Sequence, residues 1–492
     1  MKSSRMDFTR WTSKPYPLTI EEREQNNLDR VTEPEELPEI RHPIPFMDLI
    51  RHLPGFIQSK LAERTVVRRV IANSGWMYLD QVWRMVLGLG VSIWVARYLG
   101  PEQFGRLSFA VAFVSLVAPV ASLSLSGLLV RDLVRVGNAA AGVMLGTAMI
   151  MKLTAGVMVC LGCVLCAFYM NTGDHATVWL IAATACGAVF QCLDAIDSWW
   201  QANSRFGVSA MARMAGATVA AAVKATLILM HAPLLAFAIV GTAETLFFGV
   251  GWLIAYLVLP RPQGRWQWSN AQALAWLRET WPIVLMGLAV QVQAQIDLVI
   301  MGGLLPAAQL GDYAGAIRLV TALAFLPMVL QSASGPEIAR AKVEGEDLYR
   351  NRLHRLYRGM VVMCLLSVAP LALAPRLIVH LLLGAAFAGS ASILPVLAFR
   401  LVLTGFGTAR TLFITNDRLF GLALIGSVTG ACCSVGLNLL LIPRWGVWGA
   451  VVAGLLSFSV TTFGFDAAVP ALRPNLRLMM CALVMPWRSR HH

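Results

Sequence analysis

Apolar stretches of about 20 residues alternate with short polar segments along most of the chain, from about residue 75 to residue 468. Because a helix needs roughly 20 mainly apolar residues to cross a bilayer, each stretch of that length is a candidate transmembrane helix. Twelve stretches qualify, at about 75–98, 107–130, 139–170, 177–200, 207–230, 233–259, 281–304, 312–334, 358–383, 390–415, 420–442 and 446–468. The pattern predicts an all-α polytopic membrane protein with about 12 transmembrane helices.

A polar segment at 260–280 divides the twelve stretches into two sets of six, over 75–259 and 281–468. The two sets share a weak repeat. PEQFGRLSFA (101–110) follows the first stretch, and PAAQLGDYAGA (306–316) follows the seventh. With six spans per set, both sets enter the membrane from the same side. A parallel repeat about an axis along the membrane normal is typical of transporters.

The remaining segments are polar. We expect residues 1–74 to form an N-terminal extension, largely disordered, and residues 260–280 and 469–492 to form a linker and a tail. Within 42–70, apolar residues recur at helical spacing and are followed by lysine and arginine, a pattern that favours an interfacial helix. A loosely ordered tail is the alternative.

Charge is scarce and unevenly placed. Only 14% of the residues are charged, against about 25% in soluble proteins. The net charge of +13 could suggest nucleic acid, but lysine and arginine concentrate in alternate loops. Such asymmetry marks the cytoplasmic side, so we expect both termini, the linker and the tail there. The basic surplus is therefore a topology signal, with some attraction for anionic membrane lipids, and no nucleic-acid partner is expected.

Motifs for catalysis or metal binding are missing from the sequence. Cys160, Cys163 and Cys166 form a CxxCxxC run, but a fourth ligand is not nearby and cysteine in an apolar span behaves as a small hydrophobe. There is no G-x4-G-K-[ST] motif for ATP, no HExxH and no G-x-S-x-G. We expect no enzyme activity, no catalytic residues, no metal and no cofactor.

The segment WVARYLGPEQFGRLSFA (94–110) resembles the first hairpin of the multidrug/oligosaccharidyl-lipid/polysaccharide exporter superfamily, and more narrowly that of the O-antigen flippase-like polysaccharide translocases. Three further stretches agree in order, at 295–320, 326–340 and 437–454. The resemblance covers about 75–468 and implies two six-helix bundles around a central cavity. Lipid II flippases carry an Arg-Asp pair where this chain has Val91 and Ser92. Their two extra C-terminal spans are also missing, which argues against lipid II as the substrate.

The resemblance implies a flippase that moves a polyprenyl-pyrophosphate-linked oligosaccharide to the outer leaflet by alternating access, for cell-surface polysaccharide biosynthesis. Its setting would be the bacterial inner (plasma) membrane. The lipid-linked oligosaccharide and membrane lipids are the expected partners, with a glycan polymerase and glycosyltransferases as further candidates. Two alternatives stay open: a cation-coupled exporter of drugs or metabolites, and a non-transporting scaffold of a glycan synthesis complex.

Ionisable residues inside the expected spans are functional candidates because burying them in lipid is costly. An anionic headgroup favours the basic ones as substrate-binding residues: Arg84, Lys152, Lys224, Arg318 and Arg400. Asp80 lies four residues before Arg84, so the two can pair on one helix face. The other four have no opposite charge within a helical turn. Snorkelling at a span end is the structural alternative for Arg318 and Arg400, whereas the resemblance implies that Arg318, in a Y-x-x-A-x-R pattern, points into the cavity.

Acidic and amide side chains form a second set, for coupling or gating: Asp80, Glu244, Gln293 and Asp297. In QVQAQIDLVIMG (291–302), Gln291 and Gln295 share one helix face, and Gln293 and Asp297 share nearly the opposite face. We expect one face to line a wet cavity and the other to bond a neighbouring helix. Asp194 and Asp197, close to two tryptophans, are predicted to be solvated at the membrane interface.

Overall fold

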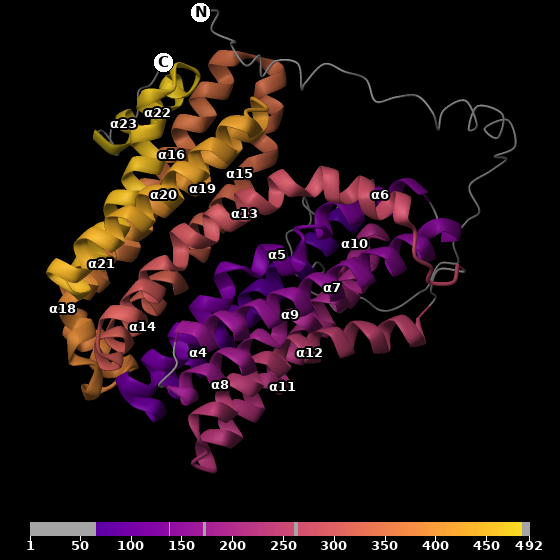
Figure 1. Ribbon diagram of the computed structural model, residues 1–492. Coiled ribbons are helices and arrows are strands. Elements are labelled where there is room, and N and C mark those ends of the chain that lie inside the picture. The colour runs from indigo at the N-terminus through magenta and orange to yellow at the C-terminus, as the bar shows by residue number, and fades with distance from the viewer. Residues whose placement is uncertain (1–64, 137, 171–173, 260–263, 485–492) are drawn as a thin grey trace, which may run out of the picture. The chain divides into compact units, whose positions relative to one another are not determined.

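The computed structural model describes residues 65–136, 138–170, 174–259 and 264–484, and every regular element in these ranges is helical (Figure 1). The chain forms two compact units, residues 1–68 and 69–492, and the second contains all the helices discussed below except the start of α4. The interfacial helix expected over 42–70 lies almost entirely outside the described residues.

The first half of the second unit contains the helices from α4 to α12. Their bounds are α4 (Thr65–Leu116), α5 (Ala118–Ser122), α6 (Ser126–Val136), α7 (Asn138–Met170), α8 (His175–Ala185), α9 (Gly187–Phe190), η3 (Gln191–Leu193), α10 (Asp194–Ala202), α11 (Phe206–Leu229) and α12 (Leu234–Val258).

The second half contains the helices from α13 to α23. Their bounds are α13 (Asn270–Leu304), α14 (Ala307–Ala322), α15 (Phe325–Glu344), α16 (Glu346–Leu373), α17 (Pro375–Leu382), η4 (Ala385–Phe387), α18 (Ala388–Leu397), α19 (Arg400–Asn416), α20 (Phe420–Trp445), α21 (Val447–Ser459), η5 (Val460–Gly464), α22 (Phe465–Ala468), η6 (Pro470–Leu472) and α23 (Arg473–Val484). The expected linker is helical from Asn270 onward, and the expected tail contains α23.

Ten helical segments of the described chain are long and apolar enough to cross a membrane, and an eleventh is the bent pair 385–397 and 400–416. The predicted all-α polytopic class is confirmed, and the number of spans is close to the twelve expected. The difference arises at Gly100, where a left-handed backbone (φ 69°) turns the chain and Pro101 starts the next helical segment. The first expected span and the start of the second therefore count as one element, α4. The remainder of the second span is divided between α5 and α6.

Figure 1 shows the helices from α4 to α12 (indigo to pink) as one group and those from α14 to α23 (salmon to yellow) as another, with α13 running along the boundary. The contacts of α13 fit this placement. Most of its length packs on α20 and α21, whereas Ala273 and Trp276 near its start belong to an apolar cluster of the first half.

Near the start of α13, Arg131 of α6 donates to Glu279 of α13 at 2.5 and 3.0 Å. Hydrogen bonds to Glu279 and Asp132 raise the pKa of Arg131 above its ordinary value.

The repeated turns of the two halves pack directly against each other. A Cβ atom on Gly105 would lie 2.1 Å from the carbonyl oxygen of Ala307, and one on Gly311 would lie 1.7 Å from that of Pro101. Glycine is required at both positions because any side chain would overlap backbone atoms of the other half. The sequence repeat seen at 101–110 and 306–316 is therefore a reciprocal contact between the halves.

Candidate functional site

A cavity of about 650 Å³ lies between the two halves. Its walls come from α4, α5, α8, α9, η3, α11 and α12 on one side and from α13, α14, α19 and α21 on the other. Most of the lining is apolar or small. The ionisable residues that line it are Arg84, Lys224, Glu244, Arg318 and Arg400. Four of the five basic candidates from the sequence therefore meet at one cavity.

Arg318 projects into this cavity from α14. Tyr313 and Ala316 are buried on other faces of α14, whereas the exposed Arg318 side chain lines the cavity together with Ala314, one turn earlier on the same face. Its Nε donates a hydrogen bond of 3.0 Å to Ser92 Oγ, on α4 of the other half. Among the described residues, no carboxylate forms an ion pair with Arg318. A guanidinium held at Nε keeps both Nη groups available, and a fork of this kind suits phosphate oxygens.

Lys224 and Glu244 form an ion pair within the first half. Lys224 Nζ lies 2.6 Å from Glu244 Oε2, which joins α11 to α12. The side chains are 22% and 33% exposed, so the pair is partly open to the cavity. Lys224 has no opposite charge within a turn of its own helix, but the structure gives it a carboxylate partner. Its partner belongs to the next helix, and spacing within one helix does not reveal such a contact.

The predicted pair of Asp80 and Arg84 is confirmed, and it belongs to a larger network. Arg84 Nε donates to Asp80 Oδ1 at 2.9 Å. Arg213 Nε donates to the second oxygen of Asp80 at 2.9 Å, and its Nη1 reaches Asp197 Oδ2 at 3.0 Å. Asp197 is buried and also bonds Ser209 and Gln201. The prediction of a solvated Asp197 is wrong, because Arg213 and two polar side chains replace water.

Lys152 lies away from the cavity. Its side chain is fully buried on α7, where the ammonium contacts Asp194 of α10 and Ser126 of α6. It does not line the cavity, so a substrate-binding role receives no geometric support. Asp194, expected to be solvated, is instead the counter-ion of Lys152. Both residues hold helices of the first half together.

Arg400 reaches the cavity wall, but its guanidinium forms its ion pair and hydrogen bonds with residues of its own half. Its Nη1 lies 2.8 Å from Asp297 Oδ2, and its Nη2 donates to the Ala294 carbonyl at 3.1 Å. Tyr313 also donates to Asp297, at 2.6 Å. The guanidinium lies 4.8 Å from the ring centroid of Phe458. Arg400 is therefore not a snorkelling end residue but the centre of a buried cluster on α13, α14, α19 and α21.

The alternating polar residues of α13 divide as their helix faces predict. Gln295 lines the cavity, and Gln291 donates to the Ser115 carbonyl of α4 at 3.1 Å. On the opposite face, Gln293 donates to Thr461 Oγ1 at 2.7 Å, and Asp297 bonds Arg400. The expectation of one cavity face and one face bonded to a neighbouring helix is confirmed.

Three further polar residues of the site were not among the site candidates from the sequence, although Ser92 was noted as a departure from the lipid II flippases. Ser92 bonds Arg318, Gln191 lines the cavity from η3, and Arg213 bridges two aspartates. Arg213 carries a signal in the sequence, since it lies within the apolar stretch 207–230. Serine and glutamine in an apolar helix carry no comparable signal. Within the described residues no cluster of three metal-ligating side chains occurs.

Comparisons with known structures place this fold. The lipid II flippase MurJ in its inward closed conformation aligns with a TM-score of 0.65 and 12% identity, covering 83% of this chain and 91% of that chain. A multidrug resistance MATE family transporter of the MOP superfamily, in an inward-facing conformation, aligns with a TM-score of 0.61 and 15% identity, covering 79% and 95%. The MATE multidrug transporter DinF-BH aligns with a TM-score of 0.57 and 14% identity, covering 85% and 97%.

Sequence comparison supplies the family. No curated protein matches the chain. The family described as polysaccharide biosynthesis protein matches residues 70–342, which is more than half of the sequence. Together with the structural matches, this confirms the superfamily resemblance inferred from residues 94–110 and the three later stretches. The chain belongs to the polysaccharide biosynthesis protein family, with the fold of the MOP superfamily.

Proposed function

We propose that this protein is a flippase that moves a polyprenyl-pyrophosphate-linked oligosaccharide from the cytoplasmic to the outer leaflet by alternating access. The observation that carries the proposal is Arg318, a cavity-facing guanidinium whose bond to Ser92 spans the two halves. Membership of a polysaccharide biosynthesis family supports a glycan substrate. A pyrophosphate would supply the direct ion-pair partner that Arg318 lacks among the described residues.

The transport step follows from the cavity chemistry. The polyprenyl tail stays in lipid while the sugars and phosphates occupy the cavity between the halves. Arg318 grips phosphate oxygens through its Nη groups, and Lys224 offers a point charge from the other half. Carrying two negative charges outward across ~100 mV, inside negative, releases roughly 4–5 kcal/mol. This energy favours export without a coupling ion.

Substitutions at Arg318 and Lys224 test this mechanism. Arg318→Ala should lose nearly all transport, Arg318→Lys should keep part because the charge remains, and Lys224→Gln should weaken transport without abolishing it. The measurement is the accumulation of lipid-linked glycan in the cytoplasmic leaflet at matched protein levels. Arg444→Ala, which removes an exposed arginine outside the cavity lining, is the control and should transport normally. Parent-like transport by both Arg318→Ala and Lys224→Gln would exclude the basic-cavity mechanism.

The ion pair of Lys224 and Glu244 favours a second candidate, a cation-coupled exporter of drugs or metabolites. Glu244 lines the cavity, and its protonation would release Lys224. In proteoliposomes, Glu244→Gln would then abolish the response of transport to a proton gradient while Arg318→Ala retained it. The flippase proposal expects the opposite: Arg318→Ala should impair transport more than Glu244→Gln does.

A further inference from the structure

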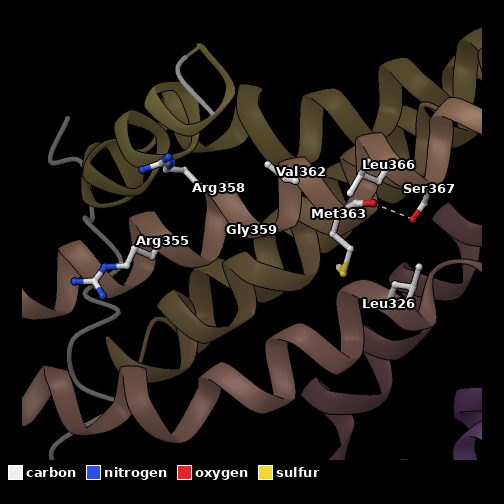
Figure 2. Close-up of a pocket in the computed structure, with 8 residues that line it drawn as sticks. All are labelled: Leu326, Arg355, Arg358, Gly359, Val362, Met363, Leu366 and Ser367. Atoms are coloured by element: carbon white, nitrogen blue, oxygen red, sulfur yellow. Dashed lines mark hydrogen bonds between the residues drawn. The ribbon is translucent and has the colours of Figure 1, made fainter. Parts of the chain in front are cut away.

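A second cavity, of about 550 Å³, lies on α16 and shares no lining residue with the central cavity. We call it the α16 groove. It is lined by Leu326, Arg355, Arg358, Gly359, Val362, Met363, Leu366 and Ser367. Figure 2 shows the two guanidinium groups toward one end, and Met363, Leu366 and Leu326 toward the other.

The lining of the α16 groove is polar at one end only. All but Leu326 come from α16, at spacings of three and four residues that place them on one helix face. Arg355 and Leu366 are eleven residues apart, which corresponds to about 16 Å along a helix. At the apolar end, the Ser367 hydroxyl donates to the Met363 carbonyl at 2.9 Å and needs no further partner. Leu366 is 70% exposed, as expected for a side chain that faces lipid.

At the arginine end, Arg355 has no counter-ion among the described residues. Of the other arginines on α16, Arg350 pairs with Glu346 at 3.1 Å, and Arg352 pairs with Glu337. For Arg355, the described part of the chain provides no carboxylate partner, and its side chain is exposed. The α16 groove therefore combines a cation that has no counter-ion in the described part of the chain with an apolar track from Val362 to Leu366, about 6 Å along the helix.

We propose that the α16 groove binds an anionic phospholipid, with the phosphate at Arg355 and Arg358 and one acyl chain along Val362, Met363 and Leu366. Charge complementarity selects this occupant. A zwitterionic lipid would bring no net charge to Arg355, and a soluble anion would leave the apolar track uncovered. Basic residues next to the membrane surface attract anionic lipids by about 1 kcal/mol each. The site is separate from the flippase proposal because it uses none of the cavity residues.

The test uses the full-length protein in phosphatidylcholine nanodiscs with and without phosphatidylglycerol, with bound lipid counted by native mass spectrometry. The parent should retain phosphatidylglycerol selectively. Arg355→Gln should weaken this retention about fivefold, and Arg355→Gln/Arg358→Gln should weaken it further. Val362→Trp, which fills the track and leaves the charges intact, should also reduce retention. The matched control is Arg350→Gln on the same helix, which should behave like the parent.

Three outcomes would overturn the proposal. The first is equal retention by the parent, Arg355→Gln and Val362→Trp. The second is displacement of phosphatidylglycerol by inorganic phosphate, which would identify a site for free anions. The third is preferential retention of polyprenyl phosphate over phosphatidylglycerol, which would make the groove part of the substrate path. Arg355→Lys keeps the charge, and its retention of lipid should exceed that of Arg355→Gln.

Discussion

At the residue scale, the basic candidates that look alike in sequence have different environments. Lys152 is buried with Asp194, Arg400 is buried with Asp297, and Lys224 pairs with Glu244 at the cavity wall. Only Arg318, among these basic residues in the described chain, projects into the cavity without an ion pair. A buried charge whose partner is a carboxylate holds helices together, whereas a charge without one is available to a ligand.

This contrast predicts opposite phenotypes for Lys152 and Arg318. Lys152→Met should lower the free energy of unfolding by about 3 kcal/mol, because Asp194 loses its counter-ion inside the helix bundle. Transport per folded molecule should be unchanged. The check is the thermal unfolding midpoint in detergent together with glycan export at matched amounts of folded protein. A Lys152→Met variant with normal stability and no export would instead make Lys152 a functional residue.

At the element scale, the turns that contain Pro101 and Pro306 bring the two halves into contact at one place. Their glycines allow backbone to meet backbone. Arg97 adds hydrogen bonds to the carbonyls of His380 and Leu381 in the second half. Phe104 and Phe387 pack edge to face with ring centroids 6.0 Å apart. These contacts join the two halves beside Phe104, which also lines the cavity.

A side chain at Gly311 should open the contact between the two turns. Gly311→Ala would place a Cβ atom 1.7 Å from the Pro101 carbonyl oxygen, so the two turns must separate. We expect a loss of about 1–3 kcal/mol in stability, as for overpacking. In a cysteine-free background with a single cysteine placed at Ser92, this cysteine should react faster with an impermeant thiol reagent in the Gly311→Ala variant than in the parent. Gly303→Ala is the control, since nothing lies within 4 Å of its Cβ position. Equal labelling in the two variants would contradict the role of this contact.

The start of α8 should depend on pH. Asp174 accepts hydrogen bonds from the hydroxyl and the backbone N–H of Thr177, at 2.7 and 3.3 Å. The bond from the Thr177 hydroxyl is the main cause of a pKa of Asp174 below its ordinary value. Ionised Asp174 therefore stabilises the start of α8. Because its pKa is lower in the folded state, this stabilisation is complete above the unfolded pKa of about 3.9 and is lost as the pH falls below that value.

Hydrogen exchange in the first turn of α8, corrected for its intrinsic pH dependence, should therefore increase as the pH falls below about 4. Asp174→Ala should show the faster exchange above about pH 4, and the exchange rates of the two proteins should converge at lower pH. An exchange rate in the parent that is independent of pH would show that the Asp174 cap does not hold this turn.

At the scale of the whole molecule, the sidedness of the loops determines how the cavity meets the two leaflets. Loop charge predicts that residues near 175 and residues near 263 lie on opposite sides of the membrane. Reporter fusions at His175 and Gln263 should report the outer side and the cytoplasm, respectively. A cytoplasmic signal from the His175 fusion would show that the orientation is the reverse of the predicted one. It would also contradict the proposed outward direction of transport.

The sequence by itself determined the class of the protein. Apolar stretches of membrane-spanning length impose helices, because backbone polar groups in lipid must bond within one segment. It also determined the pair of Asp80 and Arg84 and the two faces of residues 291–297, because both depend on periodicity within a single helix. The similarity of PEQFGRLSFA and PAAQLGDYAGA was visible in the sequence as a repeat, but the sequence did not show that the two segments contact each other.

Only the tertiary structure decided which candidates share a site. The partners of Lys152, Lys224 and Arg400 lie 42, 20 and 103 residues away in sequence, on helices whose rotation and neighbours depend on packing. The same packing buried Asp197 beside Arg213, divided the second expected span among α4, α5 and α6, and left Arg318 facing the cavity. A charge has the same appearance in a sequence whether its neighbour is a carboxylate, water or a ligand, and contacts between helices determine which of these it meets.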